Sequence, residues 1–265
     1  MTWAGGDAAG SVGRRAKCLN RARRPDMFAG GLIRRTPPGI PMTPLLLALS
    51  LAQPPSGQYR PVDPAPHELD RSNTWTLHFA YTPPRIVSLD VPGRGKRVVW
   101  YMAYQVWNTT DTPLTFIPRF ELVTKDGPLV ALLDDPQPSL AEAVRKLEDT
   151  TNSLNMQTSV SISKTPIPVT RVDSVPRSVY GIAVWSEVAE KAPTVNNFSV
   201  YVTGLSNGIA EQMDGGITRK TLQLDFVRST DTARQMLDDI RPNENGGLRA
   251  FKWMYRAAPS SRQAK

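Results

Sequence analysis

Beyond residue 74 the chain is a series of short runs rich in β-branched and aromatic residues, and turn-forming residues separate one run from the next. Runs of this kind predict β-strands, because branched and aromatic side chains suit a pleated, half-buried surface. Helical patterns do not alternate with these runs, which argues against a parallel sheet whose strands are joined by helices. The sequence therefore predicts a mostly β fold in which antiparallel strands form a sandwich or a barrel.

Three of these runs carry a further prediction. Residues 98–107 are apolar at almost every position, which indicates a central strand that is covered on both faces. Pro118 lies within the alternating run 114–123 and predicts an edge or a bulge, because proline has no N–H for the ladder. Gly181 in the run 179–188 predicts a bulge or close packing against a ring. The other expected strands cover residues 75–81, 85–91, 129–133, 156–163, 170–175, 197–204, 218–228 and 249–255.

One segment has the pattern of a helix. Ser139 and Glu142 have the spacing of a capping box. The apolar residues that follow at helical spacing are Leu140, Val144 and Leu147. Because this helix interrupts a run of strands, we expect it to cover an open end of the β structure. Residues 231–240 predict a second short helix.

Two parts of the β region resemble a known architecture. The stretch 101–127 contains YQVWN at 104–108 and IPRFELVT at 117–124, and it resembles the strand-turn-strand core of exported bacterial immunoglobulin-like proteins. The segments 179–185 and 198–208 strengthen this resemblance. It implies an antiparallel immunoglobulin-like β-sandwich with one or two short helical insertions. No activity and no functional residue is transferred with it.

A short apolar run near the N-terminus indicates export. Residues 42–52 are rich in leucine and end in a small residue, like the apolar region and cleavage site of a secretory signal. We therefore expect cleavage between Ala52 and Gln53. The run is far shorter than the roughly 20 apolar residues of a membrane span, so we expect no transmembrane anchor. The native start stays open among Met1, Met27 and Met42.

The positive charge of the chain is concentrated ahead of this run. Residues 1–41 carry eight Lys or Arg against two Asp, whereas the rest of the chain is nearly neutral. We predict that residues 1–41 are a basic disordered leader that need not belong to the native protein. The mature part lacks the basic footprint of a nucleic-acid binder, so no nucleic-acid partner is expected for it. Cys18, the sole cysteine, lies in the leader, so the mature part can form no disulfide.

The domain boundaries follow from these shifts in composition. Residues 53–72 are rich in proline and predict an extended linker. Residues 73–257 form the expected β-sandwich domain, and residues 258–265 form a disordered tail.

The chain has no motif that identifies a catalytic centre. Neither His67 nor His78 is accompanied by a Gly-x-Ser-x-Gly segment, so we expect no catalytic residue and no cofactor. Asp238, Asp239 and Asn243 lie in an oxygen-rich stretch of the kind that binds calcium, but their spacing does not match an EF-hand loop. We expect no metal site, and a solvated loop is the simpler interpretation of these three candidate ligands.

Amphipathic side chains on strands are the main candidates for ligand binding. Such rings can stack on sugars or hold peptide segments, although large aromatic residues also belong to cores. The candidates are Trp107, Trp185, Trp253 and Tyr255. The basic stretch 218–221 and Arg228 could contact an acidic polymer, and protection of an edge strand by charge explains them equally well.

Together these features predict an exported, non-enzymatic β-sandwich that serves as a binding or structural module of the cell envelope. It would be periplasmic or secreted, and its partner would be an envelope protein or polysaccharide. Two alternatives stay open. One is an exported hydrolase that uses carboxylates or a calcium site in the loop 238–245. The other is a cytoplasmic protein that binds nucleic acid through its basic N-terminal arm at residues 14–35.

Overall fold

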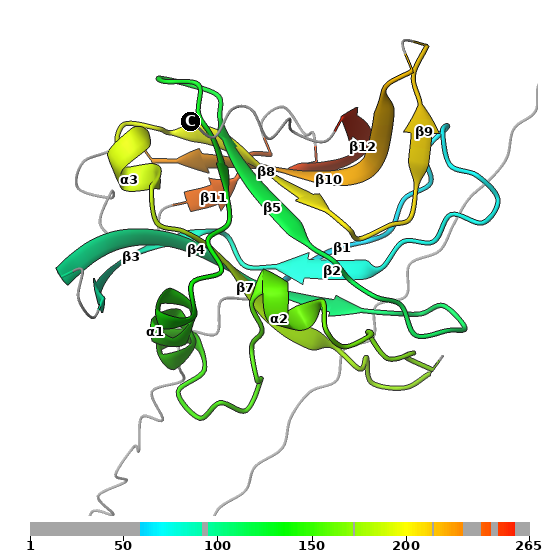
Figure 1. Cartoon of the computed structure of the whole chain (residues 1–265), viewed down its shortest axis with the longest axis horizontal. Helices are drawn as coiled ribbons and strands as arrows, with labels where there is room; N and C mark the ends of the chain where they lie inside the picture. The colour runs from blue at the N-terminus through cyan, green and yellow to red at the C-terminus, as the bar shows by residue number, and fades with distance from the viewer. Residues whose placement is uncertain are drawn as a thin grey trace, which may run out of the picture. The chain divides into compact units, whose positions relative to one another are not determined.

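The chain forms two antiparallel β-sheets in the computed structural model (Figure 1). The structure describes residues 59–91, 95–171, 173–213, 215–229, 240–244 and 249–257, which all fall within the unit Leu51–Lys265. The first sheet consists of β1 (Arg60–Val62), β2 (His78–Tyr81), β3 (Arg85–Val91), β4 (Gly95–Trp107) and β7 (Val179–Trp185). The second consists of β5 (Arg119–Thr124), β6 (Ala131–Leu133), β8 (Asn197–Thr203), β9 (Ile209–Glu211), β10 (Ile217–Arg228), β11 (Ile240–Pro242) and β12 (Phe251–Ala257). The described helices are α1 (Pro138–Glu148), α2 (Ser159–Ile162) and α3 (Val188–Lys191).

Each sheet is built around one long strand. β4 pairs with β2 and β3 along one edge and with β7 along the other, and β1 extends the sheet beyond β2. In the second sheet β10 pairs with β8 and β9 along one edge and with β11 and β12 along the other. β5 and β6 extend this sheet beyond β8. Every one of these pairs is antiparallel, which confirms the predicted mostly β, antiparallel fold.

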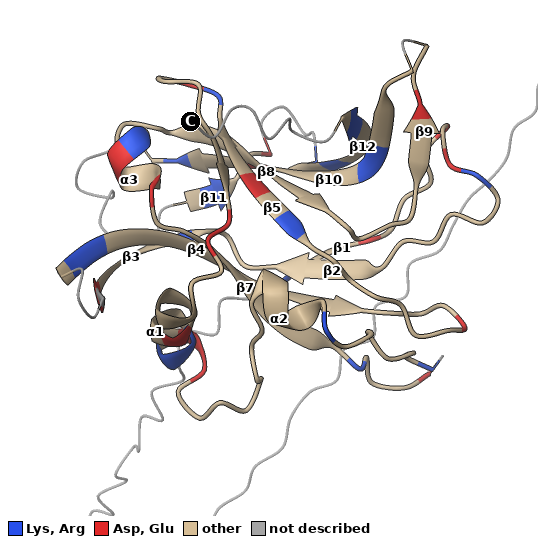
Figure 2. Ribbon diagram, viewed as in Figure 1, with Lys and Arg blue, Asp and Glu red and all other residues tan. Residues whose placement is uncertain are grey.

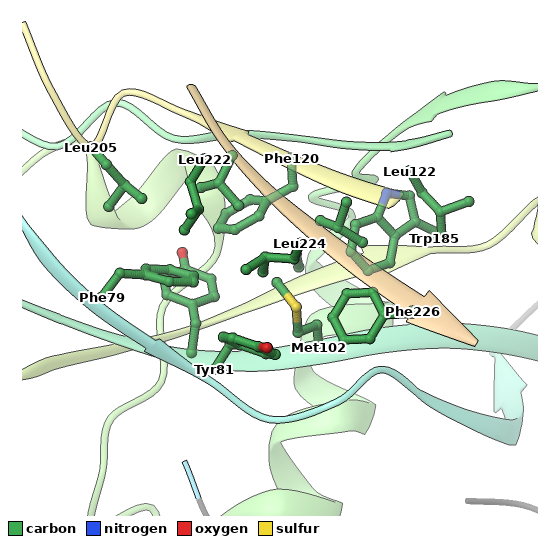
Figure 3. Close-up of a cluster of buried hydrophobic side chains, with 14 of the residues drawn as sticks. Phe79, Tyr81, Met102, Phe120, Leu122, Trp185, Leu205, Leu222, Leu224 and Phe226 are labelled. Atoms are coloured by element: carbon green, nitrogen blue, oxygen red, sulfur yellow. The ribbon is translucent and has the colours of Figure 1, made fainter. Parts of the chain in front are cut away.

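The main hydrophobic core lies between the two sheets. Because side chains alternate along a strand, β5 turns Phe120 and Leu122 inward while β10 turns Leu224 inward (Figure 3). Phe79 of β2 and Met102 of β4 belong to the same cluster, and all five side chains are fully buried. Burying one such side chain stabilises the fold by about 1.5–3 kcal/mol. Two apolar sheet faces that share one core are the arrangement of a β-sandwich.

The first sheet is buried on its other face as well. Leu140 and Val144 of α1 form a second apolar cluster with Tyr101 of β4 and Ile182 of β7. β4 is therefore covered on both faces, which confirms the prediction from the apolar run 98–107. α1 covers a sheet face and not an open end of the β structure, so that expectation was wrong. The physical reason is that the outer face of this sheet is itself apolar and has to be shielded from water.

α1 also begins differently from the prediction. Pro138 occupies the start of the helix, where its missing N–H costs nothing, and Gln137 is the N-cap without a side-chain hydrogen bond. The predicted capping box of Ser139 and Glu142 therefore does not form. Leu147, assigned to the apolar face, is 49% exposed.

Several predicted strands are shorter or absent in the described residues. Residues 159–162 form α2 and not part of a strand 156–163, because Thr158 and Ser161 form a capping box there. Residues 170–175 form no strand. β5 begins at Arg119, immediately after Pro118, so the strand excludes the first part of the predicted run 114–123. Because β5 lies between β6 and β8, Pro118 does not mark an edge strand. The helix predicted at residues 231–240 falls almost wholly outside the described residues.

The predicted linker 53–72 is wrong from residue 59 onward. β1 pairs with β2, and Val62 is only 1% exposed within the main core. Pro61 is tolerated because β1 is the edge strand of its sheet. The sandwich therefore begins well before residue 73. The proposed leader, residues 1–41, and the tail, residues 258–265, lie outside the described residues.

Candidate functional site

The two sheets differ in what covers their outer faces. α1, α2 and α3 pack mainly against strands of the first sheet. The second sheet has no comparable helix packing among the described residues, and charged residues occur along its strands β5, β10 and β12 (Figure 2). The outward side chains of β5, β8, β10 and β12 form a polar surface. We call this surface the open face.

The alternation of side chains explains why the open face is polar. The inward positions of β5, β8 and β10 carry apolar residues of the core, so the positions between them point outward. The outward side chains include Arg119, Glu121, Tyr201, Thr203, Gln223 and Asp225. A polar sheet face of this kind is stable in contact with water, although Glu121 and Gln223 are each only 4% exposed.

One group on the open face is an ion pair stacked on a ring. The guanidinium of Arg256 pairs with the carboxylate of Glu121 and lies 4.0 Å from the centre of the Tyr201 ring. Glu121 is only 4% exposed, so it depends on this partner. A cation held over an aromatic face gains about 0.5–2 kcal/mol. Arg256 is thus neutralised and held in place by its neighbours.

A second group gathers around Asp225. Its Oδ1 accepts hydrogen bonds from Lys125 at 2.7 Å, from Ser199 at 2.6 Å and from Gln223 at 2.7 Å. Burial alone would raise the pKa of Asp225, but these donors outweigh burial and hold the pKa below its ordinary value. This part of the open face therefore satisfies its own charges.

A hollow of about 620 Å³ lies at one end of the open face. It forms where the loop before β5, the loop after β8 and the start of β10 meet. Its basic side consists of Arg119, Arg219 and Arg256, and Trp75 and Ile117 are the large apolar side chains that line it. None of its lining residues is acidic. We call it the arginine hollow.

Two of these arginines have no counter-charge among the described residues. Neither Arg119 nor Arg219 forms an ion pair with any carboxylate among the residues that the structure describes, whereas Arg256 is neutralised by Glu121. Among the described residues, the Nε atom of Arg119 is buried and has no hydrogen-bond partner. Burying an unsatisfied polar group costs about 1–3 kcal/mol. The charges of Arg119 and Arg219 in the hollow are thus left without compensation by the described residues.

Gly204 shapes the floor of the arginine hollow. Its φ of +92° is a conformation that side chains with a Cβ rarely adopt, and it allows the chain to turn at the end of β8. A Cβ on Gly204 would lie 2.1 Å from the carbonyl oxygen of Ile117. The loop before β5 can approach the loop after β8 only because this Cβ is absent.

The loop after β8 also holds Trp75 at the edge of the hollow. The N–H of Trp75 donates to Oδ1 of Asn207 at 2.8 Å, and the hydroxyl of Ser206 donates to the carbonyl of Trp75 at 2.5 Å. The Trp75 ring packs against the main core and is only partly buried. Ile117 is 68% exposed. The hollow therefore presents two apolar side chains together with its arginines.

A buried ion pair anchors the segment that carries Trp75. The ammonium of Lys220 is 2.5 Å from Oδ2 of Asp70, and the hydroxyl of Tyr255 donates to Oδ1 of Asp70 at 2.8 Å. Burial alone would raise the pKa of Asp70, but hydrogen bonds from Lys220, from the N–H of His67 and from Tyr255 hold it below its ordinary value. Burial and the contact with Asp70 raise the pKa of Tyr255 to about 12.

Two of the four candidate aromatic residues are buried. Trp185 is 1% exposed and Trp253 is 9% exposed, so both belong to the core and are not available to a ligand. Tyr255 is held by Asp70, and Trp107 stacks on His78 with ring centres 5.1 Å apart. The sequence left surface and core open for these side chains, because alternation alone does not show which face of a strand is covered.

The remaining candidate residues lie outside the arginine hollow or outside the described residues. The N–H of Leu69 donates to Nδ1 of His67, and His78 contacts Thr109. The same described residues contain no group of three His, Cys, Asp or Glu side chains placed to hold a metal. Asn243 donates its backbone N–H to the carbonyl of Asp225. Asp238, Asp239, Ala52 and Gln53 lie outside the described residues.

The sequence contained part of the signal for the arginine hollow. Arg219 was in the basic stretch proposed to contact an acidic polymer, and Arg119 was on the polar side of an alternating run. Nothing in their order along the chain showed that they share one hollow, because 100 positions separate them. Trp75 was expected only as the start of a strand.

Comparisons of the chain with protein-family models, with curated proteins and with solved structures found no match. The site is therefore assigned from its geometry and charge. Within the described ranges, none of the helices has both the length and the apolar content needed to cross a membrane.

Proposed function

We propose that the protein is an exported, non-enzymatic binding module of the cell envelope, periplasmic or secreted, which holds a negatively charged ligand in the arginine hollow. The observation that carries this proposal is the pair Arg119 and Arg219, which line one hollow and have no acidic partner in the described part of the chain. Guanidinium groups match carboxylate, phosphate and sulfate oxygens in geometry as well as in charge. Export rests on the signal-like residues 42–52.

We also propose that the strand order is immunoglobulin-like. If β4 corresponds to strand B of that fold, then β5, β6, β7, β8 and β10 correspond to strands C, C′, E, F and G. The pairing of β4 with β7 and of β5 with β6 supports this assignment. So does the pairing of β8 with both β5 and β10. β11 and β12 are additions to the G edge.

This assignment places the arginine hollow at the end of the sandwich that carries the B–C and F–G loops. The loop between β4 and β5 corresponds to the B–C loop, and the loop between β8 and β10 corresponds to the F–G loop. These loops cluster at one end of the sandwich, where antibody variable domains bind their ligands. The analogy with antibody domains concerns the fold alone. The proposed binding function is therefore supported by the arginines and not by the topology.

The proposal is tested by titrating the purified protein with two polyanions of different backbone, poly-L-glutamate and polygalacturonate. The double variant Arg119→Gln/Arg219→Gln should bind at least tenfold more weakly to whichever polyanion the protein binds, because each arginine supplies a charged hydrogen bond of about 1.5–3 kcal/mol. Binding should also fall as salt is added.

A matched control separates the hollow from general positive charge. The double variant Arg171→Gln/Arg177→Gln removes the same charge from two exposed arginines of a loop, and it should bind like the unchanged protein. Equal weakening by both double variants, or no binding to either polyanion, would refute the assignment of the hollow. Mass spectrometry of the native protein from envelope fractions tests export, which requires a terminus at or near Gln53.

A further inference from the structure

We infer that the ligand of the arginine hollow is an anionic sugar chain, that is, a glycan that carries carboxylate groups. This inference rests on the proposed function and narrows it to one class of ligand. An acidic peptide is the competing class, because it offers the same charge. The two classes of ligand require different groups besides positive charge, and the residues that line the hollow favour the glycan.

The apolar part of the hollow fits a sugar ring. A pyranose ring has a face of C–H groups and a rim of hydroxyl groups, so it needs an apolar platform with polar groups around it. Trp75 offers a large ring and Ile117 a 68% exposed aliphatic side chain. Aromatic side chains that combine an apolar body with a polar edge are suited to such ligands.

The polar part of the hollow offers hydroxyl groups beside the two arginines. Thr115, Thr203 and Ser206 all line it, but the Ser206 hydroxyl is already engaged with Trp75, Thr76 and Gly208. The hydroxyl of Thr115 has no hydrogen-bond partner among the described residues, so it is available to a ligand. The hydroxyl of Thr203 makes only a long contact of 3.4 Å with the carbonyl of Arg119. Hydroxyl groups can both donate to and accept from the hydroxyls of a sugar.

The backbone around the hollow does not favour a peptide. Extended peptides that bind to sheets gain most of their affinity from main-chain hydrogen bonds to a free strand edge. Arg119 is already paired with Thr203 across β5 and β8, and Arg219 is paired with Ile209 and Arg256 on its two sides. These residues therefore offer a ligand their side chains and not their main chain.

The size of the hollow agrees with a short stretch of glycan. Its volume of about 620 Å³ falls within the range of roughly 300–1,000 Å³ found for small-ligand pockets.

Three oligomers separate the classes of ligand: tetragalacturonate, tetraglutamate and the neutral sugar maltotetraose. We expect tetragalacturonate to bind at least tenfold more tightly than either of the other two. If tetraglutamate binds equally well or better, the glycan inference is overturned, although the proposed anion site survives. If maltotetraose binds equally well, the inferred need for an anionic sugar is overturned. If none of the three binds, the glycan inference is overturned, and the polyanion titration decides separately on the proposed function.

Variants of the sugar-specific contacts provide the second test. Trp75→Leu should weaken the binding of tetragalacturonate at least fivefold, whereas Trp107→Leu, on the first sheet, should leave this binding unchanged. Because Trp75 packs against the core, Thr115→Val serves as a second variant at an exposed position. The Thr115→Val variant should bind tetragalacturonate about threefold or more weakly, and any residual binding of tetraglutamate should be unchanged. If Thr115→Val and a folded Trp75→Leu variant both bind tetragalacturonate normally, the sugar-specific contacts are refuted.

Discussion

Removing one partner of the buried ion pair between Lys220 and Asp70 should be one of the most destabilising single changes outside the core, because the other charge stays buried without a partner. The Lys220 side chain is 2% exposed and its ammonium is 2.5 Å from the Asp70 carboxylate. Asp70→Asn removes the counter-charge and leaves the ammonium buried. Removing one partner of a buried pair costs about 3–5 kcal/mol, so we expect the free energy of unfolding to fall by that amount.

The reverse change should cost less. Lys220→Met leaves Asp70 with hydrogen bonds from Tyr255 and from the N–H of His67, and the Asp70 side chain is 16% exposed and partly solvated. We expect a loss of about 1.5–3 kcal/mol, the contribution of one charged hydrogen bond. The double variant should cost less than the sum of the two, with a coupling of about 1–3 kcal/mol.

The assay is unfolding in urea at pH 7, followed by tryptophan fluorescence. The urea concentration at the midpoint should fall, while the slope of the unfolding free energy against urea concentration stays the same, since the folded structure is retained. Glu187→Gln serves as the control, because its ion pair with Lys191 is exposed and should contribute nothing measurable. A loss below about 1 kcal/mol for Asp70→Asn, or simple additivity in the double variant, would refute the reasoning.

The same pair predicts a dependence on pH. The pKa of Asp70 in the folded protein lies below its ordinary value of 3.8. A carboxyl group with a lowered folded pKa contributes its full stability above the unfolded pKa and loses it as the pH falls through the folded pKa. The difference in stability between the protein and Asp70→Asn should therefore be constant near pH 7 and shrink below about pH 4.

Two further substitutions test the packing. In Gly181→Ala the new Cβ would lie 2.3 Å from Cζ of the fully buried Tyr104, so unfolding experiments should show a loss of about 1–3 kcal/mol. Adding Tyr104→Leu should make the combined loss smaller than the sum of the two single losses; simple addition would contradict the clash. Leu140→Ala in α1 should cost about 2–4 kcal/mol, whereas Leu147→Ala on the same helix should cost well under half as much, because Leu147 is 49% exposed. Equal losses at the two leucines would contradict the placement of α1.

Local patterns predicted the features that depend on a few adjacent residues. The run 98–107, apolar at almost every position, predicted a strand buried on both faces, and β4 has this environment. Gly181 predicted close approach to a ring, and the ring is that of Tyr104. In both cases the environment is recorded in the residue types themselves, since a polar side chain or a Cβ could not be accommodated there.

Predictions failed where distant segments decide the outcome. The proline-rich residues 59–72 look like a linker by composition, yet β1 pairs with β2 and Asp70 binds Lys220. Trp185 and Trp253 were candidates for both the surface and the core, and the structure buries both of them. Composition describes a segment by itself, whereas burial depends on what another segment brings to it.

By itself the sequence determined the fold class, the central position of β4 and the polar character of the alternating side of β5. Only the tertiary structure decided that Arg119, Arg219 and Trp75 line one hollow without a described acidic partner. Alternation sets the face on which a side chain lies, but strand pairing and the turn at Gly204 set which distant side chains become its neighbours. Strand pairing joins segments that lie far apart in the chain, so no local pattern records it.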